Sequence, residues 1–69
     1  MNITDKIRTA LAYKKMSEAE LARRFGSSPS AFNQRLKVGK FATEELQKIA
    51  AILDAEYVFE IVFPDGTRI

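Results

Sequence analysis

The 69-residue chain contains no cysteine and no histidine. These absences exclude structural disulfides, thiol nucleophiles and imidazole bases, and they leave few ligands for zinc. No apolar run comes near the roughly 18–20 residues of a membrane span, and the first residues lack the apolar block of a signal peptide. We therefore expect a cytoplasmic protein with no membrane contact, no bound metal and no cofactor.

The length leaves room for one domain, over residues 1–69. Apolar residues make up 46% of the chain and charged residues 29%, which indicates a folded protein rather than a disordered one. The core of a chain this short supplies only about 3–5 kcal/mol of stability. With disulfides and metals excluded, a partner chain is the remaining means of stabilisation.

The net charge of +2 conceals an uneven distribution. Residues 1–41 contain nine Lys and Arg against three Asp and Glu, whereas residues 42–69 contain two against six. A basic front half is typical of a surface that faces a polyanion. Charge alone does not separate this interpretation from basic side chains that only face solvent.

Apolar residues at helical spacing, together with capping residues, predict four helices in the first part of the chain. A capping box begins at Ser17, Pro29 follows the cap residue Ser28, and Gly26 and Gly39 end the second and third helices. The predicted helices cover residues 3–14, 18–25, 29–38 and 43–53, within a helical unit over residues 3–54. The predicted core comprises Ile3, Ile7, Ala10, Leu11, Leu21, Ala22, Phe25, Phe32, Leu36, Leu46, Ile49, Ala50 and Leu53.

After the fourth helix, the apolar residues alternate instead of following helical spacing. The run 56–63 is predicted as a strand, Pro64–Gly66 as a turn and residues 67–69 as a short return strand. The predicted fold is therefore mostly α, with four helices followed by a C-terminal β-hairpin over residues 56–69.

The short return strand leaves one edge of the predicted hairpin without a partner. Two copies related by a two-fold axis can pair these edges and bury Tyr57, Phe59 and Ile61, which predicts a homodimer. The alternative is a hairpin that packs on the first or fourth helix of its own chain.

The second and third helices, with a tight glycine-containing turn between them, have the pattern of a helix-turn-helix. The run MSEAELARRFG, residues 16–26, resembles the first half of the Cro/C1-type (XRE-family) helix-turn-helix domain, and SSPSAFNQ, residues 27–34, resembles its turn and recognition helix. The resemblance covers residues 3–54, and the hairpin more weakly resembles that of small regulators of this class. It implies a four-helix Cro/C1-like (lambda-repressor-like) domain and a small, repressor-like transcriptional regulator that binds specific sequences of double-stranded DNA.

The third helix contains the candidate base contacts. With Phe32 and Leu36 turned inward, helical geometry turns Ser30, Gln34 and Lys37 outward, with Asn33 on the flank. Gln34 and Asn33 can pair bidentately with adenine, and Lys37 can reach guanine or a phosphate. The resemblance adds Pro29 to the predicted base contacts, which are Pro29, Ser30, Asn33, Gln34 and Lys37. Such polar residues also occur on helix faces that only meet solvent.

The candidate phosphate contacts surround that helix. The N-terminus of the second helix, at Ser17 and Glu18, offers backbone N–H groups. The resemblance places Lys40 at the DNA backbone, and Lys37 is the second basic residue predicted to contact phosphate. Other basic residues contribute to general attraction or only to solvation: Lys14, Lys15, Arg23, Arg24 and Arg35. The chain departs from the family at Lys15, where glycine is usual, at Glu18, where glutamine is common, and at Ala42, where a capping hydroxyl is common and Thr43 can replace it.

A homodimer of such domains predicts a palindromic DNA site with half-sites about 34 Å apart. The alternative function is an antitoxin-like subunit that adds its C-terminal strand to a protein partner, such as a toxin or another regulator, with or without DNA binding. An enzyme is rejected, because the acidic residues Asp54, Glu56 and Glu60 are typical of solvated positions and the chain is too short to form a cleft.

Overall fold

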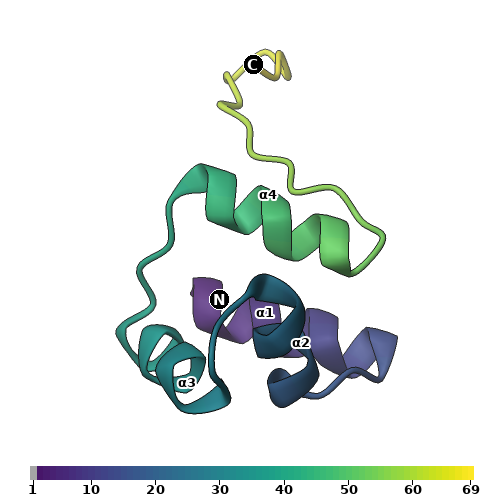
Figure 1. Cartoon of the computed structure of the whole chain (residues 1–69). Helices are drawn as coiled ribbons and strands as arrows, with labels where there is room; N and C mark the ends of the chain where they lie inside the picture. Colours follow the sequence, from purple (N-terminus) through teal and green to yellow (C-terminus); the bar gives the residue numbers. More distant parts are fainter. Residues whose placement is uncertain (1) are drawn as a thin grey trace.

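The computed structural model describes residues 2–69 and shows a mostly helical protein (Figure 1). Its helices are α1 (Ile3–Lys14), α2 (Glu18–Phe25), α3 (Pro29–Val38) and α4 (Thr43–Ile52). The four predicted helices are confirmed, with α4 ending one residue earlier than expected. Within residues 2–69, no helix has both the length and the apolar character needed to cross a bilayer.

Local capping interactions fix the ends of the first three helices. The side-chain oxygens of Asn2, Ser17 and Ser28 accept hydrogen bonds from backbone N–H groups three residues later, at 2.8, 3.0 and 3.2 Å. Gly26 and Gly39 follow α2 and α3 with φ angles of 94° and 74°, a conformation that glycine adopts without steric cost. The helix boundaries are therefore specified by residues at the boundaries themselves.

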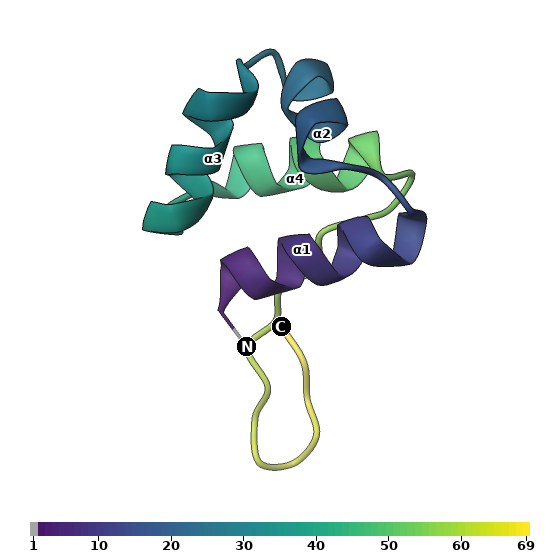
Figure 2. The ribbon, with the colours of Figure 1, turned by 90° about the horizontal axis from the view of Figure 1, so that it is seen from below.

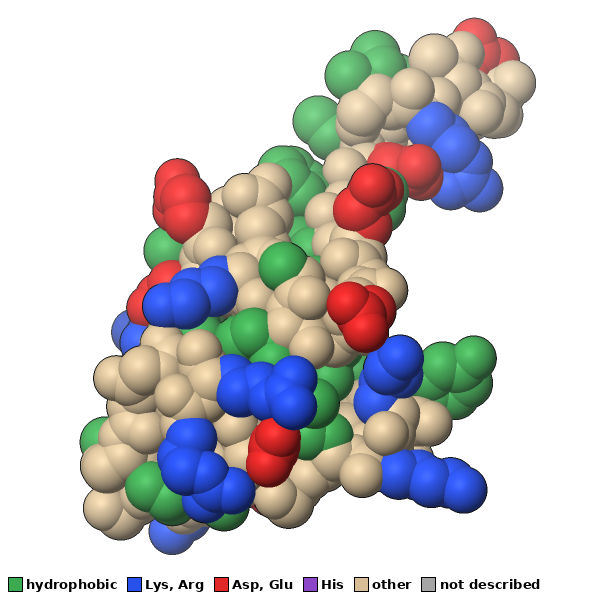
Figure 3. All heavy atoms as spheres, turned by 45° about the vertical axis from the view of Figure 1, so that its right-hand side comes forward, with side chains coloured by type: hydrophobic (Ala, Val, Ile, Leu, Met, Phe, Trp, Pro, Cys, Tyr) green, Lys and Arg blue, Asp and Glu red, His purple; other side chains and the backbone are tan. Residues whose placement is uncertain are grey.

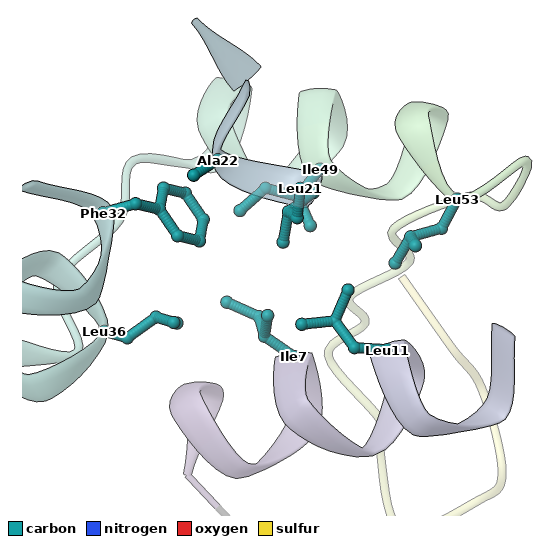
Figure 4. Packing of buried hydrophobic residues seen from close by; sticks show 8 residues of the cluster. All are labelled: Ile7, Leu11, Leu21, Ala22, Phe32, Leu36, Ile49 and Leu53. Atoms are coloured by element: carbon teal, nitrogen blue, oxygen red, sulfur yellow. The ribbon is translucent and has the colours of Figure 1, made fainter. Parts of the chain in front are cut away.

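One apolar core lies between the helices (Figure 4). The Phe32 side chain, on α3, is fully buried, and its ring centroid lies 5.4 Å from that of Phe25 and 6.0 Å from that of Phe41. The cluster consists of Ile7, Leu11, Leu21, Ala22, Phe32, Leu36, Ile49 and Leu53. Because α3 buries Phe32 and Leu36, its opposite face is left to solvent.

Lys15 links α1 to α2 in the left-handed conformation, with φ 57° and ψ 41°. In this conformation, a residue with a side chain pays a steric penalty of about 1–2 kcal/mol. Glycine avoids this penalty, and its only cost is the larger conformational entropy that it loses on folding. We expect Lys15→Gly to raise the free energy of unfolding by up to about 1 kcal/mol in urea denaturation. Lys14→Gly is the matched control, because Lys14 is helical and its replacement should lower stability by about 1 kcal/mol. A loss of stability in both variants would contradict the prediction.

The predicted C-terminal hairpin is wrong, because residues 56–69 contain no strand and only one isolated antiparallel bridge, between Val62 and Arg68. The turn at Pro64–Gly66 is present, and the Phe63 N–H donates to the Thr67 carbonyl oxygen at 2.7 Å. The return segment is too short to pair with residues 56–60, and residues 58–69 are all exposed. Two strands without a covering layer do not sustain a ladder.

Residues 56–69, called the tail from here on, extend away from the helical body (Figures 1 and 2). Both views place the tail on the side of the molecule away from α3. The tail accounts for the elongated shape, with extents of 44 × 23 × 19 Å. Packing of residues 58–69 on α1 or α4 of the same chain, the alternative expectation, is not observed.

Candidate nucleic-acid interface

The outer face of α3 carries the predicted base contacts. Pro29, Ser30, Gln34 and Lys37 are exposed, and Asn33 is half-buried. Ser30, Gln34 and Lys37 lie four and three positions apart along the helix, which brings them to one face, whereas Phe32 and Leu36 turn into the core. The structure therefore gathers the predicted set on one accessible surface.

Two interactions fix α3 against its neighbours. The Thr4 hydroxyl on α1 donates a hydrogen bond to the Leu36 carbonyl oxygen at 2.6 Å. The Arg35 guanidinium donates two hydrogen bonds to the Glu45 carboxylate on α4, at 2.6 and 2.7 Å, and lies over the Phe41 ring, 4.8 Å from its centroid. The exposed side chains of α3 are consequently presented in a fixed orientation.

The Arg35–Glu45 pair changes the role expected for Arg35, which was grouped with the solvent-facing cations. Its guanidinium is occupied by Glu45, so it braces α3 instead of facing a ligand. Sequence reasoning missed this pair because the two residues are ten positions apart and lie on different helices. Arg8, Arg23 and Arg24 are also paired with carboxylates.

The same pair makes stability depend on pH. The hydrogen bonds from Arg35, and then that from the Ala42 N–H, lower the pKa of Glu45 from 4.5 to about 2. A carboxyl group with a lowered pKa in the folded state contributes stability that is complete above about pH 4.5 and is lost as the pH falls towards 2.

We therefore expect Glu45→Gln to lose less stability than the parent chain between pH 5 and pH 2, with urea denaturation at each pH as the measurement. Glu44→Gln is the matched control, because Glu44 is the exposed neighbour outside the ion pair, and it should keep the parent slope. Equal slopes for the parent chain and Glu45→Gln would refute the assignment.

The start of α2 differs in part from expectation. Ser17 is exposed, but its hydroxyl oxygen already accepts the Glu20 N–H as the helix cap. Glu18 is half-buried, and its Oε2 lies 3.7 Å from Arg8 Nε on α1. Its Oε1 is buried without a hydrogen-bond partner. The Glu18 carboxylate is thus directed at α1, and any phosphate contact here has to come from backbone N–H groups.

Lys37 and Lys40 are the available cations beside α3. Both are exposed, and neither takes part in an ion pair within residues 2–69. Figure 3 shows mainly Lys and Arg side chains over the lower part of the helical body and mainly Asp and Glu side chains along the tail, with acidic side chains also on the body and a basic one on the tail. This distribution matches the charge difference between the two parts of the sequence.

The residues predicted for dimerisation lie in two environments. Tyr57 is half-buried and lines an apolar groove between α1 and α4, whereas Phe59 and Ile61 are 67% and 64% exposed. The N-terminus of α4 also differs from the sequence expectation. Ala42 is the N-cap residue of α4, and its side chain makes no capping hydrogen bond. Thr43 is the first residue of the helix, so its hydroxyl does not take over the cap position as expected.

Comparisons with protein-family models, with curated proteins and with solved structures give no match to this chain. The candidate interface therefore depends on the geometry of α3 and on the residue types that this helix exposes.

Proposed function

We propose that this protein binds specific sequences of double-stranded DNA through α3, as a small, repressor-like transcriptional regulator with a Cro/C1-like helix-turn-helix domain. The observation that carries the proposal is the outer face of α3. It exposes Ser30, Gln34 and Lys37 on a helix whose inner face is buried and whose position is fixed by Arg35 and Thr4.

The residue types on this face suit the major groove of B-form DNA, which admits an α-helix. The Gln34 side-chain amide can act as a bidentate partner of adenine, with its N–H group donating to N7 and its carbonyl oxygen accepting from the N6 amino group, and Lys37 can donate to guanine. Lys40, just beyond α3, is exposed and can donate to a phosphate, a contact that fixes the position of the protein on DNA without reading the sequence. No part of the tail covers α3, so the face is open to a ligand (Figure 2).

The test is a selection of bound duplexes from a random pool with the full chain, followed by affinity measurements at several salt concentrations. We expect one enriched motif and an affinity that falls steeply with salt, with Lys40→Ala reducing the slope of log affinity against log salt by about 1. Lys6→Ala is the control, because Lys6 is exposed on α1 and lines the groove that holds Tyr57, and it should keep the parent slope. The absence of duplex binding at low salt would overturn the proposal.

The exposed apolar residues of the tail favour a second candidate, an antitoxin-like subunit that binds a protein partner through this segment. A chain that acts only in this way would bind no duplex at any salt concentration, so the same measurement separates the two functions.

A further inference from the structure

Val38 is an exposed apolar residue at the end of α3. Its side chain is 67% exposed, and within residues 2–69 it belongs neither to the apolar core nor to the residues packed around it. Valine also favours a helix less than alanine does, because its branched side chain loses rotamer freedom there. Neither packing nor helix stability therefore explains a valine at this position.

Val38 continues the row of candidate base contacts along α3. Residues four positions apart lie on the same side of a helix, so Ser30, Gln34 and Val38 follow one another along it. Gln34 points directly away from the buried pair, Phe32 and Leu36. Val38 lies about 40° from Gln34 around the helix axis and about 6 Å along it. The outer face of α3 therefore combines polar side chains with one apolar side chain.

The end of α3 that carries Val38 is held in place. The Gly39 N–H donates to the Arg35 carbonyl oxygen at 2.8 Å, which closes the last turn of the helix around Val38. The Thr4 hydroxyl on α1 donates to the Leu36 carbonyl oxygen at 2.6 Å. A Cβ atom on Gly39 would lie only 3.3 Å from the Thr4 hydroxyl oxygen, so the two helices are in close contact here. Val38 is thus presented from a fixed backbone.

A valine side chain has one suitable target among the base edges of the major groove. Of the groups that distinguish the four bases there, only the thymine C5-methyl is apolar, and the others are hydrogen-bond donors or acceptors. Valine has neither a donor nor an acceptor in its side chain, so it gains free energy by covering that methyl group. The rise of about 6 Å from Gln34 to Val38 spans about two base pairs of 3.4 Å each.

We propose that Val38 is a specificity-determining residue that packs on the C5-methyl group of a thymine, within about two base pairs of the adenine contacted by Gln34. This inference rests on the function proposed for α3 and makes its ligand more specific. The preferred duplex contains two A·T pairs close together, one recognised through hydrogen bonds and the other through its methyl group.

The test replaces thymine with deoxyuridine, which lacks only the C5-methyl group. Each thymine of the duplex selected by the full chain is replaced in turn, and affinity is measured by fluorescence anisotropy. We expect one replacement to lower the affinity of the parent chain about fourfold, the effect of removing one methyl group from an apolar contact. In Val38→Ala, the same replacement should leave the affinity nearly unchanged, because the contact is already lost.

Val58→Ala is the matched control, because Val58 is 63% exposed but lies in the tail, away from α3 (Figure 2). The quantity compared is the ratio of affinities for the thymine and deoxyuridine duplexes, so a change in overall affinity does not affect it. Val58→Ala should keep the ratio of the parent chain. Both variants should fold as the parent chain does, because both side chains are exposed.

The outcomes separate this inference from the proposed function. Duplex binding that no deoxyuridine replacement weakens would overturn the role of Val38 and leave the proposed function intact. So would a loss of the same size in Val38→Ala and in the parent chain, or a sensitive thymine far from the base pair at which Gln34→Ala relaxes the preference. The absence of duplex binding at low salt would overturn the proposed function, and this inference with it.

Discussion

Replacing Phe32 with alanine is expected to leave the chain largely unfolded at 25 °C. The Phe32 ring is fully buried and packs between Phe25 and Phe41. Truncation of a buried phenylalanine to alanine costs about 3–5 kcal/mol. The core of a chain this small supplies about the same amount in total, so no margin remains. Far-UV circular dichroism and urea denaturation would measure the loss.

Tyr13→Ala is the control for this experiment. The Tyr13 side chain is 86% exposed, and substitutions at such positions change stability by about 0.5 kcal/mol at most. A Phe32→Ala variant that unfolds cooperatively near the parent midpoint would show that the core is not organised around this ring.

The second large effect concerns DNA recognition, and it depends on the proposed function. Gln34→Ala should reduce discrimination at a single base-pair position by about 1–3 kcal/mol, which is roughly 5- to 150-fold. Binding to duplexes altered at that position should then equal binding to the selected sequence. Competition binding with a set of single-position variants of the selected duplex measures this directly.

Lys40→Ala is the comparison, because a phosphate contact should weaken binding to all sequences alike. Both residues are exposed, so both variants should keep the parent unfolding midpoint. Loss of affinity by the same factor on every duplex in both variants would contradict the division between base and phosphate contacts.

The helices could be predicted from the sequence because their signals are local. Ser17 and Ser28 cap the residues that follow them within one turn, and Gly26 and Gly39 take the left-handed conformations that end helices. The exposed face of α3 could also be predicted, because burial of Phe32 and Leu36 determines which residues of the helix point outward.

Other features depend on contacts that spacing does not encode. The Arg35–Glu45 pair joins two helices, and no periodic pattern indicates that Arg35 pairs with a carboxylate on α4. The tail shows the opposite problem. Its alternating residues are typical of a strand, but a strand also needs a partner with enough residues, and the three residues after Gly66 do not provide one.

The position of the tail has a consequence for how two bound copies would sit on DNA. The chain leaves the groove between α1 and α4 after Tyr57, on the side away from α3 (Figures 1 and 2). In a homodimer of the kind predicted from the sequence, joined only at the tails, no contact would hold the two helical bodies in one relative orientation. Such a pair would tolerate more than one distance between its two recognition sequences, unlike a dimer whose bodies are clamped together.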